Sequence, residues 1–177
     1  MASRIRASVF VGTSVDGYIA RLNGALDFLP AEPEDHGYSA FMASVDTLVI
    51  GRGTYETVLG FDSWPYAGKR VVVLSSRPVA PPRLPGAAVE HLSGRPADIV
   101  ARLAERGAQH LYVDGGITIQ RFLEAGQIQR LIITRVPVLI GSGIPLFGAL
   151  TRDVRLQHVS TRHYESGLVQ SEYLVVS

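Results

Sequence analysis

Short apolar runs alternate along the chain with segments in which apolar residues recur every three or four positions. The short runs are rich in β-branched residues, which predicts buried strands, and the periodic segments predict helices. The predicted strands cover residues 5–11, 47–50, 70–74, 87–91, 111–113 and 130–136, with a brief extended piece at 18–20. The predicted helices cover residues 35–44, 54–59 and 96–105, and a further helix follows Gly116 with Ile119, Phe122 and Leu123 on one face.

Two longer alternating segments close the chain. Residues 154–164 and 168–176 alternate between apolar and polar side chains, and only Glu165, Ser166 and Gly167 separate them. This spacing predicts an antiparallel hairpin. Short apolar strands that alternate with helices are typical of a mostly parallel sheet with both faces covered. We therefore predict an α/β fold with three αβα layers, a mostly parallel central sheet and an antiparallel C-terminal hairpin.

Composition narrows the class of protein. The chain has 177 residues, no cysteine and a net charge of +1, which gives no electrostatic case for nucleic acid or an anionic membrane surface. Its length suits one domain, residues 1–177, with a substantial core. Lack of cysteine fits a reducing cytoplasm, and no apolar run has the length of a secretion signal or a membrane span. We expect a cytoplasmic protein with a small-molecule substrate.

The most informative stretch is Asp114-Gly115-Gly116, which stands between a predicted strand and a predicted helix. Backbone N–H groups at a helix N-terminus attract anions, and two glycines let a phosphate approach closely. This pattern fits a pyrophosphate seat. It also fits an ordinary tight connection, and the sequence alone leaves both readings open.

Two other predicted strands end in a similar way. Gly51, Arg52 and Thr54 follow one of them, and Ser75, Ser76 and Arg77 follow the next. Ligands of open parallel sheets bind outside the carboxyl ends of the strands, so three such ends favour a ligand with several phosphates. Taken singly, each remains compatible with a turn and a solvated arginine. The G-x-G-x-x-G fingerprint is absent after the first strand, which argues against a standard Rossmann domain.

These motifs resemble the dihydrofolate-reductase-like superfamily, in particular the stand-alone relatives of the riboflavin-biosynthesis reductase, the C-terminal domain of the deaminase-reductase. The matching segments occur in family order across most of the chain. They are SVDGYIA (14–20), DTLVIGRGTYE (46–56), LSSRP (74–78), VDGG (113–116) and PVLIGSGIPLF (137–147).

The resemblance implies NADPH as the hydride donor and a homodimer as the assembly. It places Arg52 and Thr54, with Gly51 beside them, at the adenosine-side phosphates and Ser75, Ser76 and Arg77 at the 2′-phosphate. It places Gly115, Gly116, Ile117 and Thr118 around the pyrophosphate. The loop from Ser14 to Ile19, with Thr13 before it, is expected over the nicotinamide.

The substrate side is less defined by the sequence. Asp16 is the candidate proton donor, although an aspartate before glycine is also an ordinary turn residue. Tyr38, Phe41, Ile144 and Phe147 are the candidate substrate contacts, with core packing as the alternative for Phe41. We find no helical match to the carboxylate with which dihydrofolate reductases bind the pterin. We also find no basic cluster for a ribose phosphate beyond the cofactor arginines.

The expected function is therefore hydride transfer from NADPH to a small pteridine- or pyrimidine-like heterocycle. One reaction of this kind is the reduction of 5-amino-6-(5-phosphoribosylamino)uracil in riboflavin biosynthesis. The alternative is a non-catalytic, dimeric NADP(H)-binding module with a reductase fold. The five histidines show no metal-ligand spacing, so no metal is expected.

Overall fold

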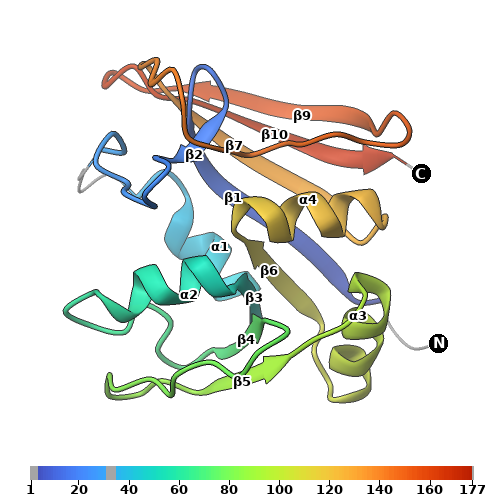
Figure 1. Ribbon diagram of the computed structural model, residues 1–177. Coiled ribbons are helices and arrows are strands. Elements are labelled where there is room, and N and C mark those ends of the chain that lie inside the picture. Colours follow the sequence, from blue (N-terminus) through green and yellow to red (C-terminus); the bar gives the residue numbers. More distant parts are fainter. Residues whose placement is uncertain (1–3, 31–34, 177) are drawn as a thin grey trace.

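The computed structural model describes residues 4–30 and 35–176 of the chain. The sequence predicts a loop over residues 21–34, and residues 31–34 of it lie outside the described residues. Within the described residues, a single large sheet runs through the centre of the molecule (Figure 1).

Eight strands form this sheet, in the order β5-β4-β3-β6-β1-β7-β10-β9. The first six of them in this order pair in parallel, and the last two add antiparallel pairs. The strands are β1 (Arg6–Ser14), β3 (Thr47–Gly51), β4 (Arg70–Leu74), β5 (Val89–Leu92), β6 (His110–Asp114), β7 (Arg130–Val136), β9 (Arg155–His163) and β10 (Val169–Val176). A separate small pair joins β2 (Tyr18–Ala20) to β8 (Ile144–Pro145).

Helices cover both faces of the sheet. The helices are α1 (Tyr38–Ser44), α2 (Arg52–Leu59), α3 (Pro96–Glu105) and α4 (Gly116–Glu124). One core cluster packs Phe41 of α1 and Tyr55 of α2 on one face, while another packs Leu103 of α3 and Phe122 of α4 on the other. Because successive strand residues point to opposite faces, fully apolar strands such as Val71–Val73 feed both clusters. The predicted three-layer α/β fold is confirmed.

Helix α1 begins at Tyr38, three residues later than the pattern predicted. His36 has φ 47° and Gly37 has φ 86°, and neither value is compatible with a right-handed helix. Asp35 still serves the helix start, because its carboxylate accepts a hydrogen bond from the Ser39 N–H at 2.8 Å. An acidic group next to the first helical N–H groups is favourable there.

Other boundaries also differ from the prediction, and β1, predicted over residues 5–11, continues to Ser14. Arg52 and Gly53, predicted as a turn, form the first turn of α2, where their N–H groups need no helical partner. The glycines at 141, 143 and 148 predict a loop around Ile144, but this segment contains β8, which pairs with β2. Sequence periodicity cannot show such a short pairing, because its two strands lie far apart in the chain.

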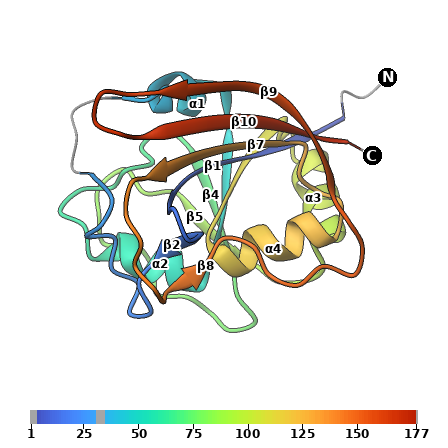
Figure 2. The ribbon, with the colours of Figure 1, turned by 90° about the horizontal axis from the view of Figure 1, so that it is seen from above.

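The terminal hairpin is also confirmed, and it forms one end of the sheet (Figure 2). β9 is the outermost strand, and all nine of its residues are exposed. Among the described helices, none combines the length and apolar character that a membrane crossing requires.

Candidate active site

The carboxyl ends of β4, β3, β6 and β1 lie side by side at one edge of the sheet, because these four strands are parallel neighbours. Ser75 follows β4, Arg52 follows β3, Gly115 follows β6, and Ser14 ends β1. The convergence expected from the sequence is therefore present. The chain brings its hydroxyl, guanidinium and glycine motifs to one edge of the sheet.

Ser75 connects the two arginines of this edge. Its hydroxyl oxygen accepts a hydrogen bond from Arg52 Nη1 at 3.4 Å and another from the Arg77 backbone N–H at 3.1 Å. Arg52 Nε also donates to Glu56 at 2.8 Å, which fixes the guanidinium along α2. Ser76 and Arg77 are exposed, and within the described residues the Arg77 guanidinium makes no hydrogen bond or ion pair. Arg77 is thus available to an anionic ligand.

Glycines at the ends of β3 and β6 allow each strand end to approach the helix that follows the other strand. A β-carbon on Gly51 would lie 2.7 Å from Thr118 Oγ1, and one on Gly115 would lie 2.7 Å from Thr54 Oγ1. Gly115 also has φ 99°, a conformation that other residues rarely adopt. The four residues form a crossed arrangement in which the start of α2 touches the turn before α4, and the start of α4 touches the end of β3.

Gly116 brings the small β2–β8 pair against the start of α4. A β-carbon at Gly116 would lie 2.9 Å from Ile144 Cγ2 and 2.9 Å from the Pro145 carbonyl oxygen. The same position would lie 3.3 Å from Ile19 Cδ1. Ile144 was predicted as a substrate contact, and the structure places it beside the cofactor candidates Ile19 and Gly116. Ile117, next in α4, is 71% exposed.

Asp16 holds the loop that precedes β8. Its carboxylate accepts hydrogen bonds from the Gly141 N–H at 2.8 Å and from the Ile140 N–H at 3.2 Å. The Ser14 side chain, followed by these backbone groups, lowers the pKa of Asp16. Ser14 Oγ in turn accepts a hydrogen bond from the Tyr18 N–H at 3.0 Å, and Thr13 is buried. The catalytic role expected for Asp16 stays a prediction, while its contacts show a positioning role.

A cavity of about 610 Å³ opens on the α1 face of the sheet, close to the same edge. Tyr38 lines this cavity with Phe10 and Tyr112, and its role as a substrate contact stays a prediction. Phe41 lies behind them, 4% exposed, with its ring centroid 5.0 Å from that of Phe10 and 4.9 Å from that of Tyr112. Neither Ile144 nor Phe147 lines this cavity, and Phe147 is 44% exposed.

Asp114 is the residue whose chemistry the sequence analysis missed. Burial raises the pKa of Asp114 to about 6, although one of its oxygens accepts a hydrogen bond from the Gly115 N–H at 2.8 Å. After burial, the charge of Asp114 contributes to raising the pKa values of Tyr38 and Tyr112, which line the cavity. The signal was available in the sequence. Strand alternation puts residue 114 on the same face as Tyr112, two residues earlier.

The described residues include no group of three or more histidine, aspartate or glutamate side chains that could hold a metal ion. The donors that do converge are guanidinium, hydroxyl and backbone N–H groups. This donor set is suited to phosphates.

Residues 8–170 match the model of the RibD C-terminal domain. The chain belongs to the RibD C-terminal domain family. It is 39% identical to a protein of Shewanella sp. PV-4 that is named for riboflavin biosynthesis, with a TM-score of 0.89 over 98% of this chain and 100% of that one. It is also 33% identical to the uncharacterized protein YwjB of Bacillus subtilis (strain 168), over 94% of this chain and 95% of YwjB.

The fold is also shared with a more distant protein. Dihydrofolate reductase from Enterococcus faecalis, in a complex with NADP(H) and RAB-propyl, matches with a TM-score of 0.68 at 18% identity, over 99% of this chain and 98% of that one. The predicted dihydrofolate-reductase-like fold and the predicted membership of the riboflavin-reductase branch are thus confirmed.

Proposed function

We propose that this protein is an NADPH-dependent reductase that transfers a hydride to a small pteridine- or pyrimidine-like heterocycle. Membership of the RibD C-terminal domain family supports a reductase-type activity. The observation that carries the proposal is the convergence of Arg52, Ser75, Arg77 and Gly115 at one edge of the sheet, beside the cavity lined by Tyr38.

The chain's donors fit a doubly phosphorylated cofactor. Neither α2 nor α4 has a side-chain cap at its N-terminus, so the first backbone N–H groups of both helices are available at this edge. In our proposal the N-terminus of α4, from Gly116 to Thr118, holds the pyrophosphate. Arg77 and Ser76 hold the 2′-phosphate, and Arg52 serves the adenosine side. NADPH, when bound, supplies the hydride.

The chain's own contribution to the reaction is positioning and control of a proton. The cavity has aromatic walls from Phe10, Tyr38 and Tyr112, which suit a flat ring. Asp114 borders this face with a pKa of about 6, so a fraction of the molecules carry the proton near neutral pH. We propose Asp114, rather than Asp16, as the group that donates a proton to the ring, because a raised pKa suits a general acid. Asp16, with a lowered pKa, positions the loop.

The test is NADPH oxidation with a panel of pterins, pyrimidines and flavin precursors that includes 5-amino-6-(5-phosphoribosylamino)uracil. We expect sustained oxidation with at least one compound. Asp114→Asn, which keeps an oxygen for the Gly115 N–H, should lower kcat by about 100-fold or more. Asp62→Asn, at an exposed acid in the segment after α2, is the matched control and should leave kcat unchanged.

A second candidate function is a non-catalytic NADP(H)-binding module. The exposed phosphate donors favour it as much as they favour the enzyme, because binding alone needs nothing more. Tight NADPH binding without oxidation by any member of the panel would support this module and count against the reductase.

A further inference from the structure

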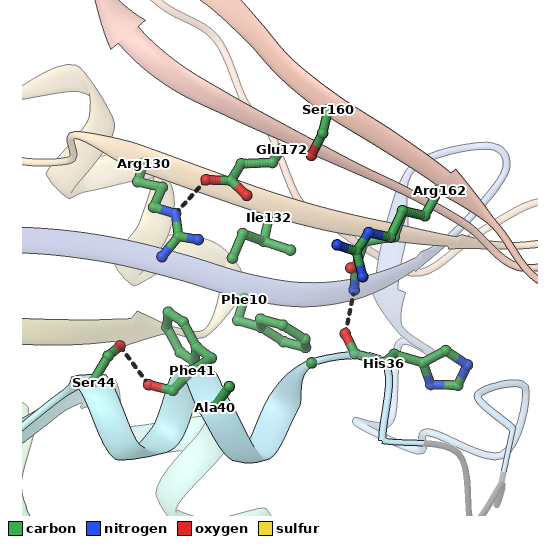
Figure 3. A pocket seen from close by; sticks show the side chains of 12 residues that line it. Phe10, His36, Ala40, Phe41, Ser44, Arg130, Ile132, Ser160, Arg162 and Glu172 are labelled. Carbon is green, nitrogen blue, oxygen red and sulfur yellow. Dashed lines mark hydrogen bonds and ion pairs between the residues drawn. The ribbon is translucent and has the colours of Figure 1, made fainter.

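A second cavity, of about 330 Å³, lies on the same face of the sheet between α1 and the hairpin β9–β10 (Figure 3). Phe10 and His36 line both this cavity and the one beside Tyr38, so the two adjoin. Phe41 and Ile132 give the second cavity an apolar wall, while Arg130, Glu172 and Arg162 supply charge.

Strand register places Arg162 in one row of paired residues that leads to the cavity beside Tyr38. Arg162 of β9 stands opposite Gln170 of β10, and Gln170 stands opposite Thr134 of β7. Thr134 in turn stands opposite Gly12 of β1, and both residues line the cavity beside Tyr38. Gln170 fixes this row, because its side-chain amide donates to Thr134 Oγ1 at 2.9 Å and to the His36 carbonyl oxygen at 3.0 Å.

The charges in this cavity do not balance. Arg130 Nε pairs with Glu172 at 2.7 Å, and both side chains are a third exposed or less. Arg162 lies at the other end of the cavity, on the side of His36 (Figure 3), and its guanidinium makes no hydrogen bond or ion pair within residues 4–30 and 35–176. One carboxylate therefore faces two guanidiniums. An anion is the ligand that would complete this set.

We infer that the cavity between α1 and the hairpin binds an anionic tail of the substrate, a phosphate ester or a carboxylate, through Arg162 with Arg130 behind it. This inference rests on the proposed function, in which the ring of the same substrate molecule occupies the cavity beside Tyr38. Phe10 and His36, which line both cavities, lie where the ring of the substrate continues into its tail. Arg162 is then a specificity residue that favours charged over neutral forms of one heterocycle.

The experiment follows the arginine Nε–H signals of ¹⁵N-labelled protein by NMR, without NADPH and without turnover. The probes are phenyl phosphate, benzoate and neutral benzyl alcohol, at millimolar concentration. We expect a saturable shift of the Arg162 signal, identified by its loss in Arg162→Gln, with at least one anion and not with benzyl alcohol. A response to phenyl phosphate alone identifies an ester tail, and a response to benzoate alone identifies a carboxylate tail.

Variants supply the second readout, which is the affinity for the anion that binds. Arg162→Gln should weaken it by about tenfold or more, while Arg155→Gln, an exposed arginine on the same strand, should not. Glu172→Gln should strengthen it, because Arg130 loses its internal partner. Anion-induced shifts confined to Arg52 and Arg77, or equal affinities in wild type and Arg162→Gln, would overturn the inference.

The outcome is separable from that of the proposed function. If Arg162 responds but no compound is reduced, the anion subsite stands and the reductase proposal fails. If NADPH is oxidised but Arg162 does not respond, only the tail subsite fails.

Discussion

Thr118 Oγ1 stands so close to Gly51 that a β-carbon on Gly51 would approach it to 2.7 Å. Gly51 ends β3, and Thr118 lies in the first turn of α4. Their contact brings the start of the helix next to a neighbouring strand end, where the phosphate donors gather. The geometry of the candidate cofactor site thus depends on the absence of a side chain at residue 51.

Gly51→Ala tests this dependence. The added carbon must displace Thr118, so we expect a loss of about 1–3 kcal/mol in the free energy of unfolding and weaker NADPH binding. Gly53→Ala is the control, because nothing lies within 4 Å of a β-carbon there and alanine favours the helix. Denaturant unfolding and cofactor titration measure both effects. Equal behaviour of the two variants would contradict the packing argument.

Asp114 should make stability depend on pH. Its pKa is about 6 in the folded protein against 3.8 for the free group, so the folded state holds the proton more tightly. The contribution of Asp114 to stability is therefore greatest below about pH 3.8 and is lost as the pH rises through about 6. Relative to that of wild type, the free energy of unfolding of Asp114→Asn should rise by about 1–3 kcal/mol between pH 4 and pH 7. Denaturant unfolding at several pH values measures the free energy of unfolding of both proteins. A difference between wild type and Asp114→Asn that does not change with pH would count against the raised pKa.

Asp16 should act on the mobility of one loop. Asp16→Ala removes the acceptor of the Ile140 and Gly141 N–H groups, and we expect their amide hydrogen exchange to accelerate about tenfold or more. Asp27→Ala, which breaks the exposed ion pair with Arg21, is the control and should leave these amides unchanged. Unaltered exchange at residues 140 and 141 in Asp16→Ala would remove the positioning role.

We propose that two copies of the chain pair through the hairpin. β9 has no outer neighbour in the sheet, and Leu156 and Leu174 are each 42% exposed on the hairpin. Light scattering should give about twice the 19.1 kDa mass of one chain, and Leu156→Glu should return the single-chain mass. A wild-type protein of single-chain mass at micromolar concentration would refute this pairing.

The sequence predicted those features that depend on local pattern. Apolar strands such as β4 and turn motifs such as Asp114-Gly115-Gly116 can be recognised from a few neighbouring residues. The ends of these strands then lie together because the strands are parallel neighbours in the sheet. The start of α1 was misplaced, because the hydrophobic pattern does not show that His36 and Gly37 adopt positive φ values.

Features that depend on partners distant in the chain stayed hidden. The β2–β8 pair joins residues more than a hundred positions apart, and the raised pKa of Asp114 comes from burial that only the fold creates. The row that links Gly12, Thr134, Gln170 and Arg162 required the register of four strands. A basic side chain for a substrate tail therefore escaped the sequence analysis.

The central claim is that the edge formed by Arg52, Ser75, Arg77 and Gly115 binds NADPH. The most direct measurement is the pair of dissociation constants for NADPH and NADH, in wild type and in Arg77→Ala, with the exposed Arg83→Ala as control. We predict that wild type and Arg83→Ala prefer NADPH, and that Arg77→Ala loses about tenfold or more of that preference. Equal affinities of the wild type for the two cofactors, or an unchanged preference in Arg77→Ala, would contradict the account.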